Sequence, residues 1–443
     1  MQGPEGATSC YHFRLPAPDP QAMVWNLQLV PMISKPVKHL IMLGKLGKII
    51  LPEICRSNPF FFAAILTLSF PGCNRVADSD IRDDEDCNLV QEYGPQGVIE
   101  IKTETVVTGL EVPWSIAFLP NGDALVTERE GRLRLVTGIY NDPRLVPQPV
   151  ATLEVGPSSE GGLMGIELHP DFIKNRLFYL VVTVLREEDM INRIERWELS
   201  EDGTTARQES IIYDEIRAGN IHNGGRIKFG PDGMLYAGTG EAGDPDLSQD
   251  PESPNGKLLR LTPEGEIPND NPRSGSPVLI SGIRNTQGWD WPDENDAATF
   301  WLVDHGPSGE MGRFGHDQVY VARAGDNLGW PDVYGCEVME GFRAPVHVWE
   351  PAVPPGGAAI YRGDAIPEWE GDLIIGTLRS RHLHRIVIED GLTREHEVYL
   401  EEDYGRLREV IMGGDGELYI TTSNCDGRGT CPDEQDMIIR VTR

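Results

Sequence analysis

The sequence is poor in basic residues. It contains 39 Lys and Arg against 70 Asp and Glu over 443 residues, which gives a formal charge of −31 at pH 7. Proteins that bind DNA or RNA need a basic face that neutralises phosphates. The charge balance therefore argues against a nucleic acid as the partner.

Long helical patterns are missing as well, because no segment keeps an apolar period near 3.6 residues over a useful length. Instead, the 49 Gly and 34 Pro punctuate many short apolar runs, a pattern typical of turns and strands. The hydrophobic fraction of 39% is ordinary for a globular protein, and the length suffices for a large core. We therefore expect a folded chain dominated by β-strands.

The seven cysteines include no Cys-x-x-Cys pair, which argues against a structural zinc site. Cys425 and Cys431 flank a Gly-rich loop, and a disulfide would close it in an oxidising compartment. Cys87 and Cys336 would then remain as a second pair. Free thiols are the alternative for all four.

The N-terminal region differs from the rest of the chain. Residues 58–72 form an apolar run that is short for a bilayer span but fits the core of a signal peptide, with basic residues before it. Residues 68–73 loosely resemble a bacterial lipobox, which makes Cys73 the candidate for lipidation. Plain cleavage near Gly72 and an uncleaved anchor are the alternatives. We also expect the true start near Met32 or Met42.

This pattern divides the chain into three parts. We predict a signal or anchor region over residues 1–73, an acidic linker over 74–99 and the main domain over 100–443. Export would place the main domain in the periplasm or outside the cell, with Cys73 as a lipid anchor that tethers it to a membrane.

A weak internal repeat runs through the main domain. Its members combine a tight turn containing Asp or Asn and Gly with a following β-rich run, which is a hairpin signature. The clearest copies are residues 120–128, 231–239 and 414–422, with more distant ones at 169–183 and 370–377. Their spacing fits units of roughly 40–55 residues, the size of a propeller blade. We predict an all-β fold, a six-bladed β-propeller of four-stranded antiparallel blades.

Residues 238–243 match the pattern Gly-x-Gly-x-x-Gly, but they do not predict a dinucleotide site. That site needs a helix directly after the glycines, to hold the pyrophosphate at its N-terminus. Prolines follow at positions 245, 251 and 254, so we expect a propeller loop.

His382 and His384 alternate on one face of a predicted strand, as two metal ligands would. No third ligand is evident near them in the sequence. We therefore expect both to be surface residues.

A dispersed set of polar residues is more informative. His222 comes just before one predicted strand, and Glu241 follows the next strand. Because these positions lie at the same ends of neighbouring strands, the two side chains can form an oriented His–carboxylate pair. A purely structural histidine is the alternative.

Arginine pairs recur late in the chain, at Arg379 with Arg381 and at Arg406 with Arg408. In an acidic protein such pairs suggest a planar ligand with several carboxylates, because guanidinium binds carboxylate in a bidentate manner. Surface ion pairs with the abundant acidic residues are the alternative.

Eight motifs together resemble one family, the soluble PQQ-dependent aldose sugar (glucose/sorbosone) dehydrogenases, which are six-bladed quinoprotein propellers. The resemblance runs from about residue 100 to 443, and its order and spacing are more specific than any single motif. The motifs are residues 110–120, 160–172, 222–226, 255–260, 282–285, 305–307, 327–331 and 406–408.

The resemblance implies catalytic roles for three residues. His222 resembles the general base that removes the proton from the sugar C1 hydroxyl, and Glu241 matches the carboxylate that orients it. Arg284 resembles the group that stabilises negative charge on the quinone oxygen, with Asn285 beside it. In such a site the quinone carries out the redox chemistry, and the protein supplies the base, the orientation and the electrostatic field.

The resemblance also implies cofactor and metal ligands. Arg406 and Arg408 would clamp PQQ carboxylates, and Arg379 and Glu160 would contact the cofactor. The backbone carbonyls of Gly306 and Pro307 would bind Ca²⁺.

Two positions and one stretch of the chain depart from the family pattern. Arg379 stands where the family has Lys, and Glu160 stands where it has Gln, which adds negative charge beside an anionic cofactor. Residues 308–317 replace a short acidic stretch, which puts a second calcium site and the sugar-contacting loops in doubt.

The resemblance implies an exported enzyme that oxidises the C1 hydroxyl of aldose sugars to lactones with PQQ and Ca²⁺. It would pass its electrons to an external quinone or cytochrome. The first alternative is a six-bladed propeller lactonase, which needs Asn, Asp and Glu side chains around a central metal. The second is a non-catalytic ligand-binding propeller, which need not keep both His222 and Arg284.

Overall fold

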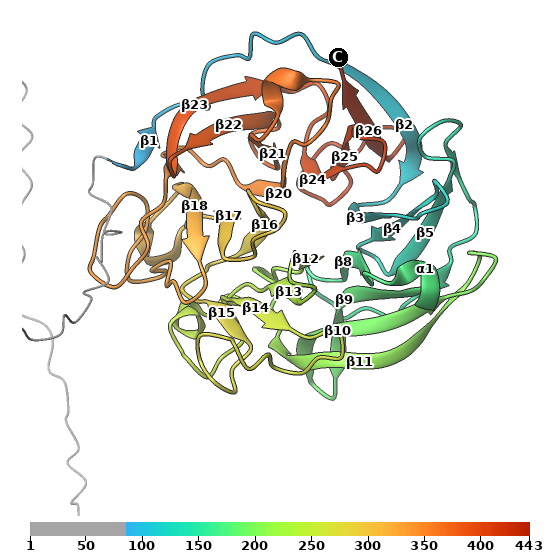
Figure 1. The fold of residues 1–443 in the computed structure, drawn as a ribbon, viewed down its shortest axis with the longest axis horizontal. Helices are drawn as coiled ribbons and strands as arrows, with labels where there is room; N and C mark the ends of the chain where they lie inside the picture. The colour runs from blue at the N-terminus through green and yellow to red at the C-terminus, as the bar shows by residue number, and fades with distance from the viewer. Residues whose placement is uncertain (1–85) are drawn as a thin grey trace, which may run out of the picture. The chain divides into compact units, whose positions relative to one another are not determined.

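Six small β-sheets follow one another around a central axis (Figure 1). The structure is a computed structural model in which residues 86–443 are described. Each sheet contains four antiparallel strands, and the first strand of each lies nearest the axis. The predicted all-β, six-bladed propeller is confirmed. The predicted signal or anchor region over 1–73, with Cys73, lies outside the described residues.

The six blades are built in chain order. Blade one comprises β3 (Pro113–Phe118), β4 (Ala124–Glu128), β5 (Arg132–Thr137) and β6 (Arg144–Leu145). Blade two comprises β8 (Leu163–Leu168), β9 (Leu177–Arg186), β10 (Asp189–Leu199) and β11 (Ala206–Arg217). Blade three comprises β12 (Ile227–Phe229), β13 (Leu235–Gly238), β14 (Leu258–Leu261) and β15 (Val278–Ile280). A short strand, β7 (Ala151–Thr152), also pairs with β5.

The last three blades repeat the plan. Blade four comprises β16 (Thr286–Asp290), β17 (Thr299–Asp304), β18 (Asp317–Arg323) and β19 (His347–Trp349). Blade five comprises β20 (Pro355–Ile360), β21 (Leu373–Thr377), β22 (Leu383–Glu389) and β23 (Leu392–Tyr399). Blade six includes β24 (Leu407–Met412), β25 (Leu418–Thr422) and β26 (Asp436–Thr442). The described helices are single turns: α1 (Phe172–Asn175), η2 (Pro245–Ser248), η3 (Glu310–Gly312) and η4 (Pro367–Trp369).

The fourth strand of blade six comes from the other end of the domain. β2 (Lys102–Leu110) pairs antiparallel with β26, and Lys102 lies opposite Thr442. The first and last strands of the ring therefore share one sheet, which closes the propeller (Figure 1). β1 (Asn88–Val90), inside the range predicted to be a linker, pairs in parallel with β19 of blade four.

The repeated turns of the sequence are equivalent positions in the fold. Residues 120–128, 231–239 and 414–422 contain the hairpins between the first and second strands of blades one, three and six. In blades three and six, Asp232 and Asp415 each accept a hydrogen bond from a tyrosine hydroxyl, at 2.8 Å. The following glycine has φ of +74° at Gly233 and +80° at Gly416, a region that disfavours side chains.

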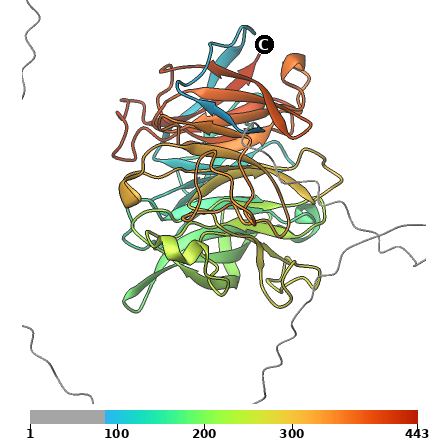
Figure 2. The same cartoon turned by 90° about the vertical axis from the view of Figure 1, so that its left-hand side faces the viewer.

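Apolar side chains pack between neighbouring blades. Val303 and Val319 of blade four lie in one buried cluster with Ile360 and Ile375 of blade five. In the side view the loops that join the strands project from the two faces of the ring (Figure 2). Because both faces of each sheet are covered, the blades form a rigid frame for the loops.

Two disulfides stabilise loops of the propeller. Cys87 bonds to Cys336, which ties the segment before β1 to the loop before β19. Cys425 bonds to Cys431 within the loop between β25 and β26. Both pairs match the predicted ones. Over residues 86–443, no helix has the length and apolar character needed to cross a membrane.

The prediction that His382 and His384 are surface residues is wrong, because both are fully buried. They do share one face near the start of β22, but that face packs between blades four and five. Two more histidines meet them there, His347 from β19 and His396 from β23. His396 comes from the next strand of the same blade, whereas His347 comes from blade four, so the sequence did not show that the four rings meet.

Candidate active site

The predicted His–carboxylate pair is formed. His222 lies in the loop before β12, and Glu241 lies just after β13. Nδ1 of His222 is 2.7 and 2.8 Å from the two carboxylate oxygens of Glu241, and both residues are buried. A carboxylate only accepts hydrogen bonds, so Nδ1–H of His222 donates to it. In the neutral ring Nε2 therefore carries the free lone pair, as a general base requires.

The glycines of residues 238–243 allow this close approach of two loops. A side chain at Gly240 would begin 2.1 Å from the backbone oxygen of His222. The N–H of Ala242 donates to that same oxygen, at 3.0 Å. The N–H of Gly243 donates to Oε2 of Glu241, at 2.8 Å. This segment is a loop, as predicted, and its glycines serve backbone packing around the pair.

Arg284 and Asn285 are positioned by a buried carboxylate. Their backbone N–H groups donate to the two oxygens of Asp304, at 2.9 and 2.8 Å. The carbonyl of Arg284 accepts from the N–H of Glu241, at 3.0 Å, which links this loop to the His222 pair. Burial raises the pKa of Asp304 to about 6, although the two N–H groups oppose that rise.

The side chain of Arg284 contacts a residue that the sequence did not single out. Its Nη2 donates to Oε1 of Glu310, at 2.6 Å, and the same oxygen is 3.8 Å from Nε2 of His222. Burial alone would raise the pKa of Glu310, but Arg284 lowers it below the ordinary value. Glu310 thus lies between the candidate base and the candidate charge-stabilising group.

A small cavity of about 40 Å³ lies beside this cluster. Its lining comes from the N-terminal ends of the inner strands and from the loops next to them, so it lies on one face of the ring. The lining residues are Trp114, Glu160, Asn223, Gly224, Asn285, Gln287, His305, Leu378, Arg408 and Arg428. Three of the predicted cofactor contacts, Glu160, Asn285 and Arg408, are among them.

Arg408 is a partly buried cation that lines this cavity. Its Nη1 donates to Oε1 of Gln287, at 3.1 Å, and its Nε is buried without a hydrogen-bond partner. Within residues 86–443, no carboxylate forms an ion pair with it. Its guanidinium carbon lies 5.8 Å from the ring centre of Trp114. Burial, with help from the nearby Arg406, lowers the pKa of Arg408 to about 10. Such a site is suited to an anionic ligand.

Arg406, in contrast, already has a carboxylate partner. Its Nη2 is 2.7 Å from Oδ2 of Asp426, and its Nε donates to the backbone oxygen of Ser423. Arg379 is exposed, and it is not among the residues that line the cavity. Of the four charged residues predicted to contact the cofactor, Glu160 and Arg408 therefore line the cavity. Arg379 and Arg406 do not.

Glu160 joins two parts of the site. Its Oε2 accepts the backbone N–H of His222, at 2.8 Å, and its Oε1 is 2.7 Å from Nη1 of Arg428. Burial would raise the pKa of Glu160, but Arg428 and the His222 N–H lower it below the ordinary value. Arg428 belongs to the loop closed by the Cys425–Cys431 disulfide, so that loop covers one side of the cavity.

The predicted metal ligands Gly306 and Pro307 are buried just beyond β17. The N–H of Gly306 donates to Oδ1 of Asp317, at 2.9 Å, and burial raises the pKa of Asp317 to about 6. The described residues contain two side-chain groups with the spacing of metal ligands. They are His222–Glu241–Glu310 and His347–His384–His396, and neither includes residues 306 or 307.

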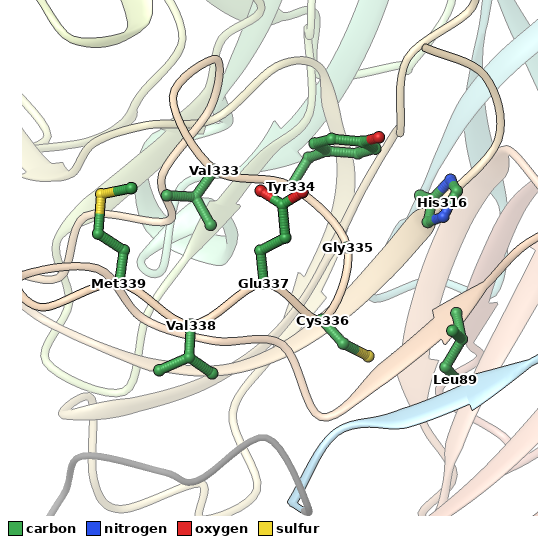
Figure 3. A pocket seen from close by; sticks show the side chains of 9 residues that line it. All are labelled: Leu89, His316, Val333, Tyr334, Gly335, Cys336, Glu337, Val338 and Met339. Carbon is green, nitrogen blue, oxygen red and sulfur yellow. The ribbon is translucent and has the colours of Figure 1, made fainter.

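A larger hollow of about 590 Å³ lies beside the disulfide-bonded Cys336 (Figure 3). Apolar side chains that are about half exposed, Leu89, Val338 and Met339, line part of it. Among the described residues that line it, there is no buried cation and no His–carboxylate pair. The chemistry-bearing residues therefore point to the smaller central site.

Residues 110–438 match the model of the Glucose / Sorbosone dehydrogenase family. The chain belongs to this family. The match covers most of the propeller and confirms the resemblance seen in the sequence motifs. Membership makes the chain an oxidoreductase of the sugar dehydrogenase type.

Individual relatives agree with this membership. The aldose sugar dehydrogenase YliI of Escherichia coli strain K12 is 30% identical over 351 residues, 74% of this chain and 91% of the relative. The quinoprotein glucose dehydrogenase B of Acinetobacter calcoaceticus is 22% identical over 72% of this chain and 84% of its own length. The PQQ-bound aldose sugar dehydrogenase of Streptomyces coelicolor is 36% identical, with a TM-score of 0.69, and the match covers 77% of this chain and 98% of that structure.

Proposed function

We propose that this protein is a PQQ-dependent dehydrogenase that oxidises the C1 hydroxyl of aldose sugars to lactones. The observation that carries the proposal is the guanidinium of Arg408, which lines the central cavity and forms no ion pair with a carboxylate of the described residues. PQQ is a planar quinone with several carboxylates, and a partly buried arginine that forms no ion pair within residues 86–443 is suited to it. The PQQ-bound relative from Streptomyces coelicolor supports the choice of cofactor.

The cavity has to open before such a cofactor can bind. Its volume of about 40 Å³ has room for about three water molecules, at roughly 10–15 Å³ each. Two ion pairs close the site, Glu160 with Arg428 and Glu310 with Arg284. Oxygen atoms of the cofactor can replace Glu160 as the partner of Arg428 and Glu310 as the partner of Arg284. Arg408, Arg284 and Asn285 would then hold the cofactor, with Arg379 and Arg406 as further predicted contacts.

The chain's own residues would perform the acid–base part of the reaction. PQQ, when bound, supplies the acceptor for the two electrons that leave sugar C1. His222 would accept the C1 hydroxyl proton at Nε2, because Nδ1 is engaged by Glu241. Glu241 would stabilise the imidazolium that results. Arg284 would place positive charge where negative charge develops, in a site shielded from water.

Calcium fits this site only in part. Ca²⁺ takes roughly 6–8 oxygen ligands, and the predicted protein ligands are two neutral carbonyl oxygens, those of Gly306 and Pro307. Neither of the two described groups of side-chain metal ligands includes these two residues. We therefore propose that calcium binds here only together with the cofactor, whose oxygens complete the coordination.

The proposed location is the periplasm or the outside of the cell. The two disulfides favour an oxidising compartment. The electrons would pass to an external quinone or cytochrome, and Cys73 would carry a lipid anchor. These three proposals rest on the sequence and on the family resemblance.

Turnover by the reconstituted enzyme tests the proposal. The full chain is loaded with PQQ and Ca²⁺, and dye reduction is followed with a panel of aldoses. We expect sugar-dependent reduction that is lost in His222→Ala and kept in His169→Ala, a histidine of the β8–β9 turn outside the site. Absence of PQQ binding would refute the quinoprotein assignment. Lactone hydrolysis without PQQ would instead support the lactonase alternative.

A further inference from the structure

Four histidines meet between blades four and five, away from the candidate active site. His347 belongs to β19, His384 to β22 and His396 to β23, and His382 directly precedes β22. His347, His382 and His384 are fully buried, and His396 is partly buried. Ring centres of His347 and His396 are 4.9 Å apart, and those of His384 and His396 are 5.5 Å apart.

Hydrogen bonds fix the tautomers of two of these rings. Nδ1 of His382 is 3.2 Å from the backbone oxygen of Ser380, so this nitrogen carries the hydrogen and donates. Nε2 of the neutral His382 ring then accepts, and its partner is Nδ1 of His384, at 3.2 Å. Nε2 of His384 is therefore left with a free lone pair. Metal-binding histidines are oriented in this way, by a hydrogen bond at the other ring nitrogen.

Three ring nitrogens point into the cluster without a partner. Nε2 of His347, Nε2 of His384 and Nδ1 of His396 are each buried and make no hydrogen bond. One ring nitrogen from each of His347, His384 and His396 lies within 4.8 Å of those of the other two. A buried polar atom without a partner costs free energy, and three that converge on one point call for a shared ligand.

Protonation does not remove this cost. Burial lowers the pKa of His347, His384 and His396, and their mutual proximity lowers it further for His347 and His384. The rings are therefore neutral near pH 7, which is the form that binds a metal ion. No Asp or Glu belongs to the group.

We propose that His347 Nε2, His384 Nε2 and His396 Nδ1 bind one divalent late first-row transition metal ion, with Zn²⁺ as the ion expected. Three neutral imidazoles with one position left open are a common zinc ligand set, whereas calcium prefers oxygen. Ligand nitrogens around zinc lie about 2.0–2.1 Å from the ion, so the rings move slightly inward when it binds. The lack of Cys-x-x-Cys pairs argues only against a zinc site with cysteine ligands, and this site uses histidine alone.

A neighbouring glycine keeps one ligand accessible. A Cβ at Gly94 would lie 2.6 Å from Nδ1 of His396, and the φ of Gly94 is +126°. Asn88 of β1 also reaches the cluster, since its side-chain amide lies 3.1 Å from Nδ1 of His347. With the amide oxygen turned to this nitrogen, Nδ1–H of His347 donates to Asn88, and the lone pair of Nε2 is free for the metal ion. The metal would thus link strands of two blades with the segment that enters the propeller. We assign it a stabilising role that is independent of the candidate active site.

Cobalt substitution tests the site in the full chain. Chelator-treated protein is titrated with Co²⁺, whose visible absorption reports four- or five-coordination, and zinc content is then measured by mass spectrometry after exchange. We expect one tightly bound ion and a rise of several degrees in Tm on adding Zn²⁺. His396→Ala, in which a partly exposed ring is removed, should weaken zinc binding about 100-fold or more. His169→Ala should leave it unchanged.

A second variant separates this site from the other group with ligand spacing. His222→Ala removes a member of the His222–Glu241–Glu310 group and should keep the cobalt spectrum and the zinc stoichiometry. An absent cobalt band in the wild-type protein would overturn the proposal without any variant. Equal zinc binding by the wild-type protein and a folded His396→Ala variant would also overturn it, as would loss of the bound ion in His222→Ala.

Discussion

Glu241 holds the imidazole of His222 by its Nδ1, with both carboxylate oxygens within 2.8 Å of that nitrogen. This contact fixes the ring and its tautomer before any ligand is present. It leaves Nε2 as the nitrogen on the side of Glu310, whose Oε1 accepts a hydrogen bond from Arg284. The site therefore combines a proton acceptor, His222, with the positive charge of Arg284.

Replacing Glu241 by glutamine should lower kcat/KM for aldoses by about 10²–10⁴-fold. The amide of Gln can donate to Nδ1, which would stabilise the tautomer with its hydrogen on Nε2 and block that nitrogen as a base. PQQ affinity should change little, since Glu241 does not line the cavity. Glu252→Gln, at an exposed position, is the control. A fully active Glu241→Gln enzyme would show that the pair is only structural.

Calcium retention should depend on the cofactor. The protein alone offers two carbonyl oxygens at Gly306 and Pro307, too few for a stable Ca²⁺ site. We expect the PQQ-loaded enzyme to keep about one Ca²⁺ through gel filtration, and the PQQ-free protein to keep none at these residues. Equal calcium content in both forms, by mass spectrometry, would contradict the expectation.

Stability should fall as the pH rises toward 8, because of a carboxyl group on an inner strand. Burial raises the pKa of Glu167 in β8 to about 8; Lys228 opposes the rise and Glu409 adds to it. The unfolded chain titrates near its usual ~4.3, so the native state binds more protons between these values, and the free energy of unfolding decreases there as pH increases.

Glu167→Gln stays uncharged and should escape much of this loss. Urea unfolding at about pH 5.5 and about pH 9 should show the variant losing less stability than the wild type, by on the order of 2 kcal/mol. Glu154→Gln, at an exposed position, should behave like the wild type. Identical pH dependence of the Glu167→Gln variant and the wild type would refute the assignment.

The two disulfides should differ in their contribution to stability. Cys87 and Cys336 are separated by 249 positions, whereas Cys425 and Cys431 are separated by 6. A longer closed loop removes more entropy from the unfolded chain. We expect the double serine variant of the first pair to cost about 2–4 kcal/mol more than that of the second. Urea unfolding of both variants measures the two losses of stability. A larger loss for the Cys425–Cys431 variant would contradict this explanation.

The local features of the fold could be predicted from the sequence because they depend on short-range geometry. A turn with Asp and Gly before a β-rich run recurs at residues 231–239 and 414–422, and both are the same hairpin of their blades. Likewise, His222 and Glu241 lie at matching ends of consecutive strands, so hairpin geometry alone brings them together.

Contacts between distant segments could not be predicted in this way. The pairing of β2 with β26 and the ion pair of Arg428 with Glu160 join parts of the chain far apart in sequence. His382 and His384 illustrate the same limit, because alternation shows that they share a face but not that another blade covers it. Glu310 lies in the stretch that departs from the family pattern, so the resemblance gave no expectation for it.

The affinity for PQQ in an Arg408→Gln variant tests the central claim most directly. Equilibrium titration of the full chain with PQQ, followed by tryptophan fluorescence, is compared among the wild type, Arg408→Gln and Arg381→Gln, an exposed arginine paired with Glu402. Loss of a charge-assisted hydrogen bond of about 1.5–3 kcal/mol predicts a Kd that rises about 10–150-fold in Arg408→Gln and stays unchanged in Arg381→Gln. Unchanged PQQ affinity in a folded Arg408→Gln variant, or no PQQ binding by the wild type, would contradict the account.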